Sequence, residues 1–233
     1  MLAVVGAVVL TDPPPPAALM RLSTATTQQA AADRPRGTIY WGGAGLDGDY
    51  ISPQLQALEE AGLRNLYVGF DSSARAYVGP AGMFIDALRA GSTYRFEEQS
   101  RTWSIRGMNG GGRQFNLIGY SYGSLLAAQT ANYYASIGHD IDHLVLIGSP
   151  IDVDFLHALQ RNRHIRKVVV INLAEHGDPI YAGMSSWELV KATPILVDQM
   201  RRGEGHFYYA AIAGDSETRW KTLAGRVFTE GLR

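Results

Sequence analysis

The chain has 233 residues, of which 46% are hydrophobic, and it contains no cysteine. A chain of this length and composition can bury one substantial core, which favours a single folded domain. Its 21 basic and 22 acidic residues leave a formal net charge of -1, so no overall positive field attracts nucleic acid or an anionic membrane. The lack of cysteine excludes disulfides, thiolate metal sites and a cysteine nucleophile.

The N-terminal 37 residues differ in composition from the rest. Residues 1–10 form an apolar run without a preceding basic segment, and four prolines follow it in place of a cleavage site. We interpret residues 1–37 as an N-terminal arm and proline-rich linker, and residues 38–233 as one domain. The run is too short to span a bilayer. We therefore expect a cytoplasmic protein, or one exported without a recognisable signal peptide, with no transmembrane segment.

From residue 38 onward, apolar runs typical of strands alternate with stretches typical of helices. The strand-like runs are 38–42, 65–70, 115–120, 143–148 and 167–173, and the helix-like stretches are 53–62, 81–90, 122–137 and 152–162. This alternation predicts an α/β fold with a mostly parallel central sheet and helices on both faces.

The first strand-like run is followed by Gly-x-Gly-x-x-Gly at residues 43–48. This motif and the acidic Asp71 near the expected spacing are typical of a dinucleotide-binding fold. However, Ser52-Pro53 predicts a helix start four residues beyond the last glycine, too far for the helix N-terminus to hold a pyrophosphate. Asp47 and Asp49 would also repel that anion. We therefore keep a nicotinamide-dinucleotide-binding oxidoreductase that uses Gly43–Gly48 only as an alternative function, from another class of enzyme than the one favoured below.

A second glycine motif, GYSYG at residues 119–123, lies between a short apolar strand and a helix. A serine at that position occupies the sharp turn called a nucleophile elbow. The flanking glycines let the strand and the helix approach without a Cβ clash. The helix N-terminus favours an anion beside Ser121, with the N–H of Tyr122 as its first donor.

A serine nucleophile needs a base, and the base needs an orienting carboxylate. Downstream of the serine, EHGDP at residues 175–179 follows a buried strand, and GEGHF at residues 203–207 places a histidine in a glycine-flanked loop. We favour Asp178 and His206 for the two positions. The competing residues are Glu175, Asp152 and Asp154 for the acid and His176 for the base.

Four segments, FNLIGYSYGSLLAAQ, VLIGSP, VVVINLAEHGDPI and GEGHFYY, occur in this order. Together they resemble an α/β-hydrolase fold serine hydrolase of the esterase/lipase type, over about residues 38–212. The resemblance implies Ser121 as nucleophile, Asp178 as orienting acid and His206 as general base and acid. In that family the histidine usually follows the last strand, whereas here the apolar run 207–209 after it is itself compatible with a strand. The chain is also similar to bacterial lipase toxin effectors that cleave phospholipids.

The glycine loop after the first strand acquires a role in this fold. A second oxyanion donor comes from the loop that follows this strand. We therefore expect the N–H of Gly43 or of Ala44 to face the oxyanion together with that of Tyr122.

The expected substrate is a small-molecule or lipid ester. The connection 151–166 has only 16 residues, so we expect a small cap or none. The apolar stretch 183–200 is typical either of an acyl-chain groove or lid, or of a core-facing helix interrupted at Pro194. The residues expected to bind substrate are Tyr120, Met184 and Trp187.

No cofactor, metal or nucleic-acid partner is expected. The stretch His139–His143 contains metal-ligand types, but it joins a helix end to a strand at the far end of the sheet from Ser121, so we interpret it as a polar connection. Transient contact with a membrane surface is compatible with a lipid ester substrate. A secretion or immunity partner fits the resemblance to toxin effectors, but no segment predicts one.

Overall fold

One parallel sheet forms the centre of the molecule. The computed structural model describes residues 35–43, 48–69 and 112–233, and within them five strands pair in the order β2-β1-β3-β4-β5. All four pairings are parallel, and every residue of β1, β3 and β4 is buried. The strands are β1 (Gly37–Trp41), β2 (Leu66–Val68), β3 (Phe115–Tyr120), β4 (His143–Ile147) and β5 (Val168–Ile171).

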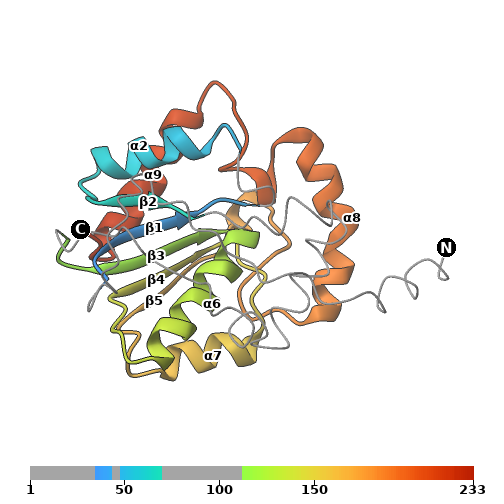
Figure 1. Cartoon of the computed structure of the whole chain (residues 1–233). Coiled ribbons are helices and arrows are strands. Elements are labelled where there is room, and N and C mark those ends of the chain that lie inside the picture. Colours follow the sequence, from blue (N-terminus) through green and yellow to red (C-terminus); the bar gives the residue numbers. More distant parts are fainter. Residues whose placement is uncertain (1–34, 44–47, 70–111) are drawn as a thin grey trace, which may run out of the picture.

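Helices cover both faces of this sheet (Figure 1). On one face lie α6 (Tyr122–Ser136) and α7 (Val153–Arg161), and on the other α2 (Ile51–Glu60) packs beside α9 (Ser216–Thr229). A further helix, α8 (Ser186–Arg202), lies beyond the carboxyl ends of the strands. The predicted α/β architecture, a parallel sheet between two helical layers, is thus confirmed. Because successive strands are parallel, the loops that leave them meet at the edge beside α8.

Several predicted boundaries differ from the observed ones. α2 begins at Ile51 with Tyr50 at its N-cap and no side-chain cap, so the predicted Ser52-Pro53 start is wrong. α8 continues through Pro194 and is not interrupted there. Residues 207–209 do not form a strand. Phe207 ends a short 3-10 helix over Gly205–Phe207, and the two tyrosines after it lie in a turn. The helix predicted at 81–90 and residues 1–34 of the N-terminal arm lie outside the described residues.

The C-terminal helix α9 was not predicted, although its sequence carries the signal. Trp220, Leu223, Ala224 and Val227 recur at helical spacing and are all buried against the sheet and α2. The Trp220 indole N–H donates to the carbonyl of Tyr209 at 2.9 Å. α9 therefore closes the second face of the sheet and anchors the segment that follows His206.

A capping box starts α8. The Ser185 hydroxyl accepts the N–H of Glu188, and the Glu188 carboxylate accepts the N–H of Ser185 in return. The hydroxyl of Tyr181 also donates to this carboxylate at 2.5 Å. The hydrogen bond from Tyr181 has the largest effect and those from Ser185 follow, and together they lower the pKa of Glu188 to about 2. Across the described part of the chain, no helix is both long enough and apolar enough to cross a bilayer.

The lowered pKa of Glu188 predicts how the stability of the protein depends on pH. The charged form of Glu188 is favoured in the folded state, so its contribution is complete above its ordinary pKa of 4.5 and is lost as the pH falls toward about 2. Glu188→Gln should lower the free energy of unfolding, measured by urea titration, at pH 6. The gap between the variant and the parent chain should narrow at pH 3, and a gap of equal size at both pH values would contradict this account.

Candidate active site

Ser121 lies at the junction of β3 and α6 in a strained backbone conformation. Its φ of 53° and ψ of -124° fall in a region that residues with a side chain rarely occupy. The Ser121 N–H donates to the carbonyl of Ile147 at 2.8 Å, and its carbonyl accepts the N–H of Ser124. These bonds hold the turn to the neighbouring strand and to the first turn of α6, so the hydroxyl projects from a rigid corner.

The two glycines of the elbow are required by contact distance. A Cβ on Gly119 would lie 2.3 Å from the carbonyl oxygen of Gly123. A Cβ on Gly123 would lie 2.1 Å from the carbonyl oxygen of Gly42 and 2.6 Å from that of Trp41. Both obstacles are backbone atoms, which cannot rotate away. The close strand–helix approach predicted from the motif is therefore present.

Three side chains form a continuous hydrogen-bonded line. Ser121 Oγ lies 2.6 Å from His206 Nε2, and His206 Nδ1 lies 2.8 Å from Asp178 Oδ2. The side chains of His206 and Asp178 are 7% and 0% exposed. The other carboxylate oxygen of Asp178 accepts the N–H of Ile180 at 2.8 Å. This geometry suits a neutral imidazole that donates from Nδ1 and accepts the serine proton at Nε2.

The competing residues have other contacts. Asp152 is the N-cap of α7, where it accepts the N–H of Phe155 at 2.8 Å. Asp154 is exposed in the first turn of that helix. Glu175 is also exposed, and it faces Arg226 at 3.9 Å and His176 at 3.6 Å. The ring of His176 stacks on Tyr208 with centroids 3.6 Å apart. Hydrogen bonds link Ser121 to His206 and His206 to Asp178.

Tyr120 is buried and bonds the backbone of the histidine. It is 2% exposed, and its hydroxyl donates to the carbonyl oxygen of His206. The two rings are nearly parallel, with centroids 6.0 Å apart. Burial first, and then the neighbouring Tyr50 and Asp178, raise the pKa of Tyr120 well above its ordinary value, so the hydroxyl keeps its proton. Tyr120 therefore holds the backbone of His206, and its expected contact with substrate stays a prediction.

The loop expected to supply the second oxyanion donor contacts a tyrosine that the sequence did not single out. A Cβ on Gly43 would lie 3.5 Å from Ser121 Cβ, so this residue does lie beside the serine. Its N–H, however, donates to the Tyr50 hydroxyl at 2.6 Å and is not directed freely at a substrate. Ala44 lies outside the described residues, and Tyr122 is the first residue of α6.

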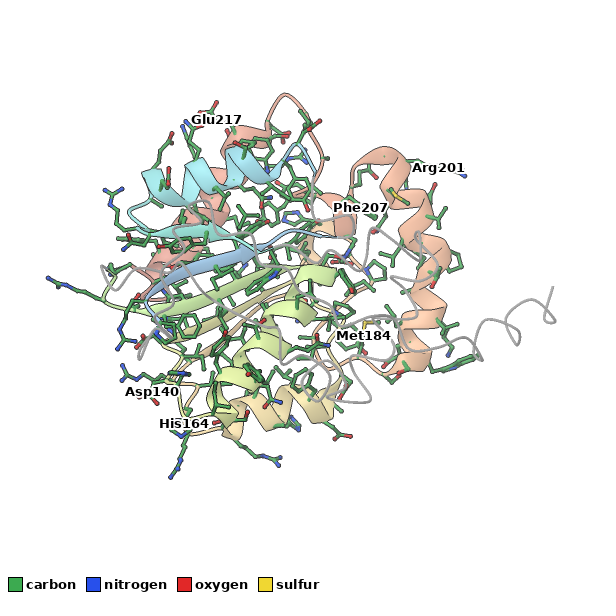
Figure 2. The ribbon with its side chains drawn as sticks, in the orientation of Figure 1. Asp140, His164, Met184, Arg201, Phe207 and Glu217 are labelled. Atoms are coloured by element: carbon green, nitrogen blue, oxygen red, sulfur yellow. The ribbon has the colours of Figure 1, made fainter. Side chains whose placement is uncertain are left out.

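The other two expected substrate residues differ in exposure. Met184 is 2% exposed and belongs to the core cluster on the α6 face; Figure 2 labels it between α6 and α8. Trp187 is 65% exposed in the first turn of α8, and the Lys191 ammonium lies 5.4 Å from its ring centre. Their contact with substrate stays a prediction.

The His139–His143 stretch serves the fold at the opposite end of the sheet. Asp142 accepts the N–H of Phe115 at 2.8 Å, and His143 pairs with Asn116 at 2.9 Å. Asp140 bonds His164 at 2.8 Å, and Figure 2 shows this pair far from the labelled Phe207 beside the candidate site. Among the described residues, no group of three or more histidine, cysteine or acidic side chains is placed to hold a metal ion.

The dinucleotide alternative gains no support from the glycine loop. The N–H of Ile51, the first residue of α2, donates to the carbonyl of Gly48 at 3.0 Å, so that helix does not open within the motif as a pyrophosphate loop requires. Gly43 lies instead against Ser121 and Tyr50. Residues 44–47 are outside the described part of the chain.

The strand order, the helices on both faces and the strained serine between β3 and α6 define an α/β-hydrolase fold. No family model and no curated protein matches the sequence. The chain is similar in structure to a dienelactone hydrolase-like promiscuous phosphotriesterase, P91, from metagenomic libraries. That similarity has a TM-score of 0.46 and 14% sequence identity, and it covers 84% of this chain and 87% of the other.

The elbow contacts predict the result of one substitution. Gly123→Ala places a Cβ 2.1 Å from the Gly42 carbonyl oxygen, so α6 or the loop after β1 must move. We expect a loss of about 1–3 kcal/mol in the free energy of unfolding, as for other overpacked sites, and a slower reaction of Ser121 with an active-site probe. Gly225→Ala is the matched control, because nothing lies within 4 Å of its added Cβ. Equal stability of the two variants would contradict the close approach.

Proposed function

We propose that the chain is a serine hydrolase that cleaves carboxylic esters through an acyl-enzyme on Ser121. The observation that carries the proposal is the line from Ser121 Oγ to His206 at 2.6 Å and on to Asp178 at 2.8 Å, with the serine at the N-terminus of α6. A buried acid, an imidazole and a hydroxyl in this order form the arrangement that activates a serine.

The chemistry follows from the positions of these groups. His206 Nε2 accepts the hydroxyl proton as Ser121 Oγ attacks the ester carbonyl carbon, and Asp178 stabilises the imidazolium that forms. The imidazolium then donates this proton to the leaving alcohol, and the acyl group stays on Ser121. In the second half, His206 removes a proton from water, the hydroxide attacks the acyl carbon, and Ser121 recovers a proton as the carboxylic acid leaves.

The oxyanion formed in each half of the reaction needs donors. The N–H of Tyr122, the residue after the nucleophile at the start of α6, is in the position of the first donor. The dipole of this 15-residue helix adds positive potential at the same point. Gly43 or Ala44 remains our proposal for the second donor; for Gly43 this requires the bond to Tyr50 to exchange for one to the oxyanion.

The surface of α8 supports a lipid or long-chain acyl ester as substrate. Its inner residues pack on the core, whereas its outer side carries several large apolar side chains that are at least 40% exposed. Such a patch is typical of a contact with lipid or with another protein. The exposed apolar residues of α8 are Trp187, Val190, Ile195, Val197 and Met200. Arg201, also exposed at the end of α8, suits an anionic lipid surface.

Three alternatives to this function are separated by simple measurements. A phospholipase-type antibacterial effector would cleave phospholipid vesicles faster than soluble esters, and this outcome would narrow the proposed function. A nicotinamide-dinucleotide oxidoreductase, or a binding protein with the same fold, would show no serine-dependent hydrolysis. Tight NADH binding without probe labelling would overturn the hydrolase proposal.

The nucleophile is tested by covalent labelling. A fluorophosphonate probe should modify Ser121. Ser121→Ala should abolish the labelling and lower the rate of ester hydrolysis at least about a thousandfold. Ser136→Ala is a matched control, because this exposed serine at the end of α6 bonds only within its own turn, to Tyr133. Labelling that persists in Ser121→Ala would assign the reactive group elsewhere.

The substrate class is tested with p-nitrophenyl esters of increasing chain length, followed by phospholipid vesicles. Trp187→Ser removes a large apolar side chain from the outer face of α8. We expect it to lower the rate with long-chain esters several-fold more than the rate with the acetate ester, because burial of the acyl chain is lost. Ile137→Ser, at an exposed position that ends α6, should leave this ratio as in the parent chain. An unchanged ratio in Trp187→Ser would remove α8 from the substrate-binding surface.

A further inference from the structure

Gln199 on α8 bridges the two loops that carry the acid and the histidine. It is 6% exposed, and both ends of its side-chain amide are used. Its Oε1 accepts the N–H of His206 at 2.9 Å, and its Nε2 donates to the carbonyl oxygen of Gly177 at 2.7 Å. One side chain therefore contacts the backbone of the histidine and the backbone immediately before Asp178.

The span of this bridge matters because the two loops come from different parts of the chain. The acid loop follows β5, whereas the histidine loop follows α8. The Asp178–His206 bond of 2.8 Å forms only when the two loops keep one separation, and the planar amide fixes that separation with a donor at one end and an acceptor at the other. Glutamate lacks the donor and leucine lacks both groups, so neither can replace the bridge.

The histidine loop is shaped to receive this amide. Gly205 has a φ of +55°, and a Cβ there would lie 2.2 Å from both Cδ and Nε2 of Gln199. The carbonyl of Gln199 also accepts the N–H of Gly203, the C-cap of α8. Figure 2 shows the end of α8, marked by Arg201, next to the loop that carries Phe207. The end of α8 is thus fitted to the histidine loop through the side chain and the backbone of one residue.

We propose that Gln199 is a positioning residue that aligns His206 with Asp178 and thereby makes the reactivity of Ser121 depend on the placement of α8. The proposal rests on the hydrolase function proposed above. Gln199 touches no reacting atom; it acts through the N–H of His206 and the carbonyl of Gly177. A purely structural role would lower stability without changing the Asp178–His206 hydrogen bond.

The first test compares Gln199→Leu and Gln199→Glu with the parent chain on a soluble short-chain ester. Two buried hydrogen bonds are lost in the first variant, and in the second a carboxylate oxygen faces the Gly177 carbonyl, so we expect kcat to fall at least about tenfold with KM changed less than about twofold. Thr193→Ala is the matched control on the same helix, since the Thr193 hydroxyl bonds only to Leu189 one turn earlier. It should keep kcat within about twofold.

The second readout does not need turnover. The proton that His206 Nδ1 shares with Asp178 is expected to give a low-field proton NMR signal, which should weaken or broaden in Gln199→Leu and Gln199→Glu and persist in Thr193→Ala. If neither the parent chain nor any variant hydrolyses esters, the function proposal fails while this signal still tests the bridge. A kcat within twofold of the parent value, or a lowered kcat with an unchanged signal, would overturn the positioning role.

A double-mutant cycle tests the fit with Gly205. Gly205→Ala alone forces the new Cβ against the Gln199 amide, and kcat should fall at least about fivefold. In the Gln199→Ala background that obstacle is gone and only the backbone strain at a φ of +55° remains, so the same substitution should have a smaller effect, about twofold. Equal effects in both backgrounds would overturn the proposed contact. The cycle also covers the case in which Gln199→Leu does not fold.

Discussion

The crossing of β3 and α6 at Ser121 is the constraint on which the rest of the site depends. The serine has a φ of 53°, a strain of about 1–3 kcal/mol for such a residue. The turn is possible only because Gly119 and Gly123 leave room for backbone atoms at less than 2.5 Å from where a Cβ would be. Packing of β3 between β1 and β4 offsets this strain, so the position of Ser121 depends on the whole sheet.

The parallel topology determines which loops reach that corner. β4 lies beside β3, and β5 lies beside β4, so the loop after β5 brings Asp178 to the same edge of the sheet. Gly148, at the end of β4, shows how close the groups are: a Cβ there would lie 3.4 Å from Asp178 Oδ2 and 3.5 Å from His206 Cε1. Ser121 and Asp178 are therefore brought together by strand ends that are close in space and separated by whole helices in sequence.

The sequence predicts the features that depend on neighbouring residues. It does not predict the roles that depend on contacts between residues far apart in the chain. Unbroken apolar runs located all five described strands, and the elbow motif located Ser121, because burial and turn sterics are written in neighbouring residues. Tyr120 and Gln199 owe their roles to hydrogen bonds with residues 86 and 22 positions away, whose placement only the fold determines. A helix interrupted at Pro194 is one of the two structures that the pattern of 183–200 allows, yet α8 continues through this residue because its ends are capped and its inner face is packed.

The backbone of His206 is held by hydrogen bonds to side chains and not by pairing in the sheet. Within the described part of the chain no strand follows β5, so the histidine loop has no ladder of backbone hydrogen bonds to hold it. Its backbone is instead bonded at both polar groups, the carbonyl by Tyr120 and the N–H by Gln199, while its ring lies between Asp178 and Ser121. A histidine held by four partners on three separate segments, the β3–α6 junction, the loop after β5 and α8, keeps its place only while those segments keep theirs. In this chain the geometry of the candidate site therefore depends directly on tertiary packing.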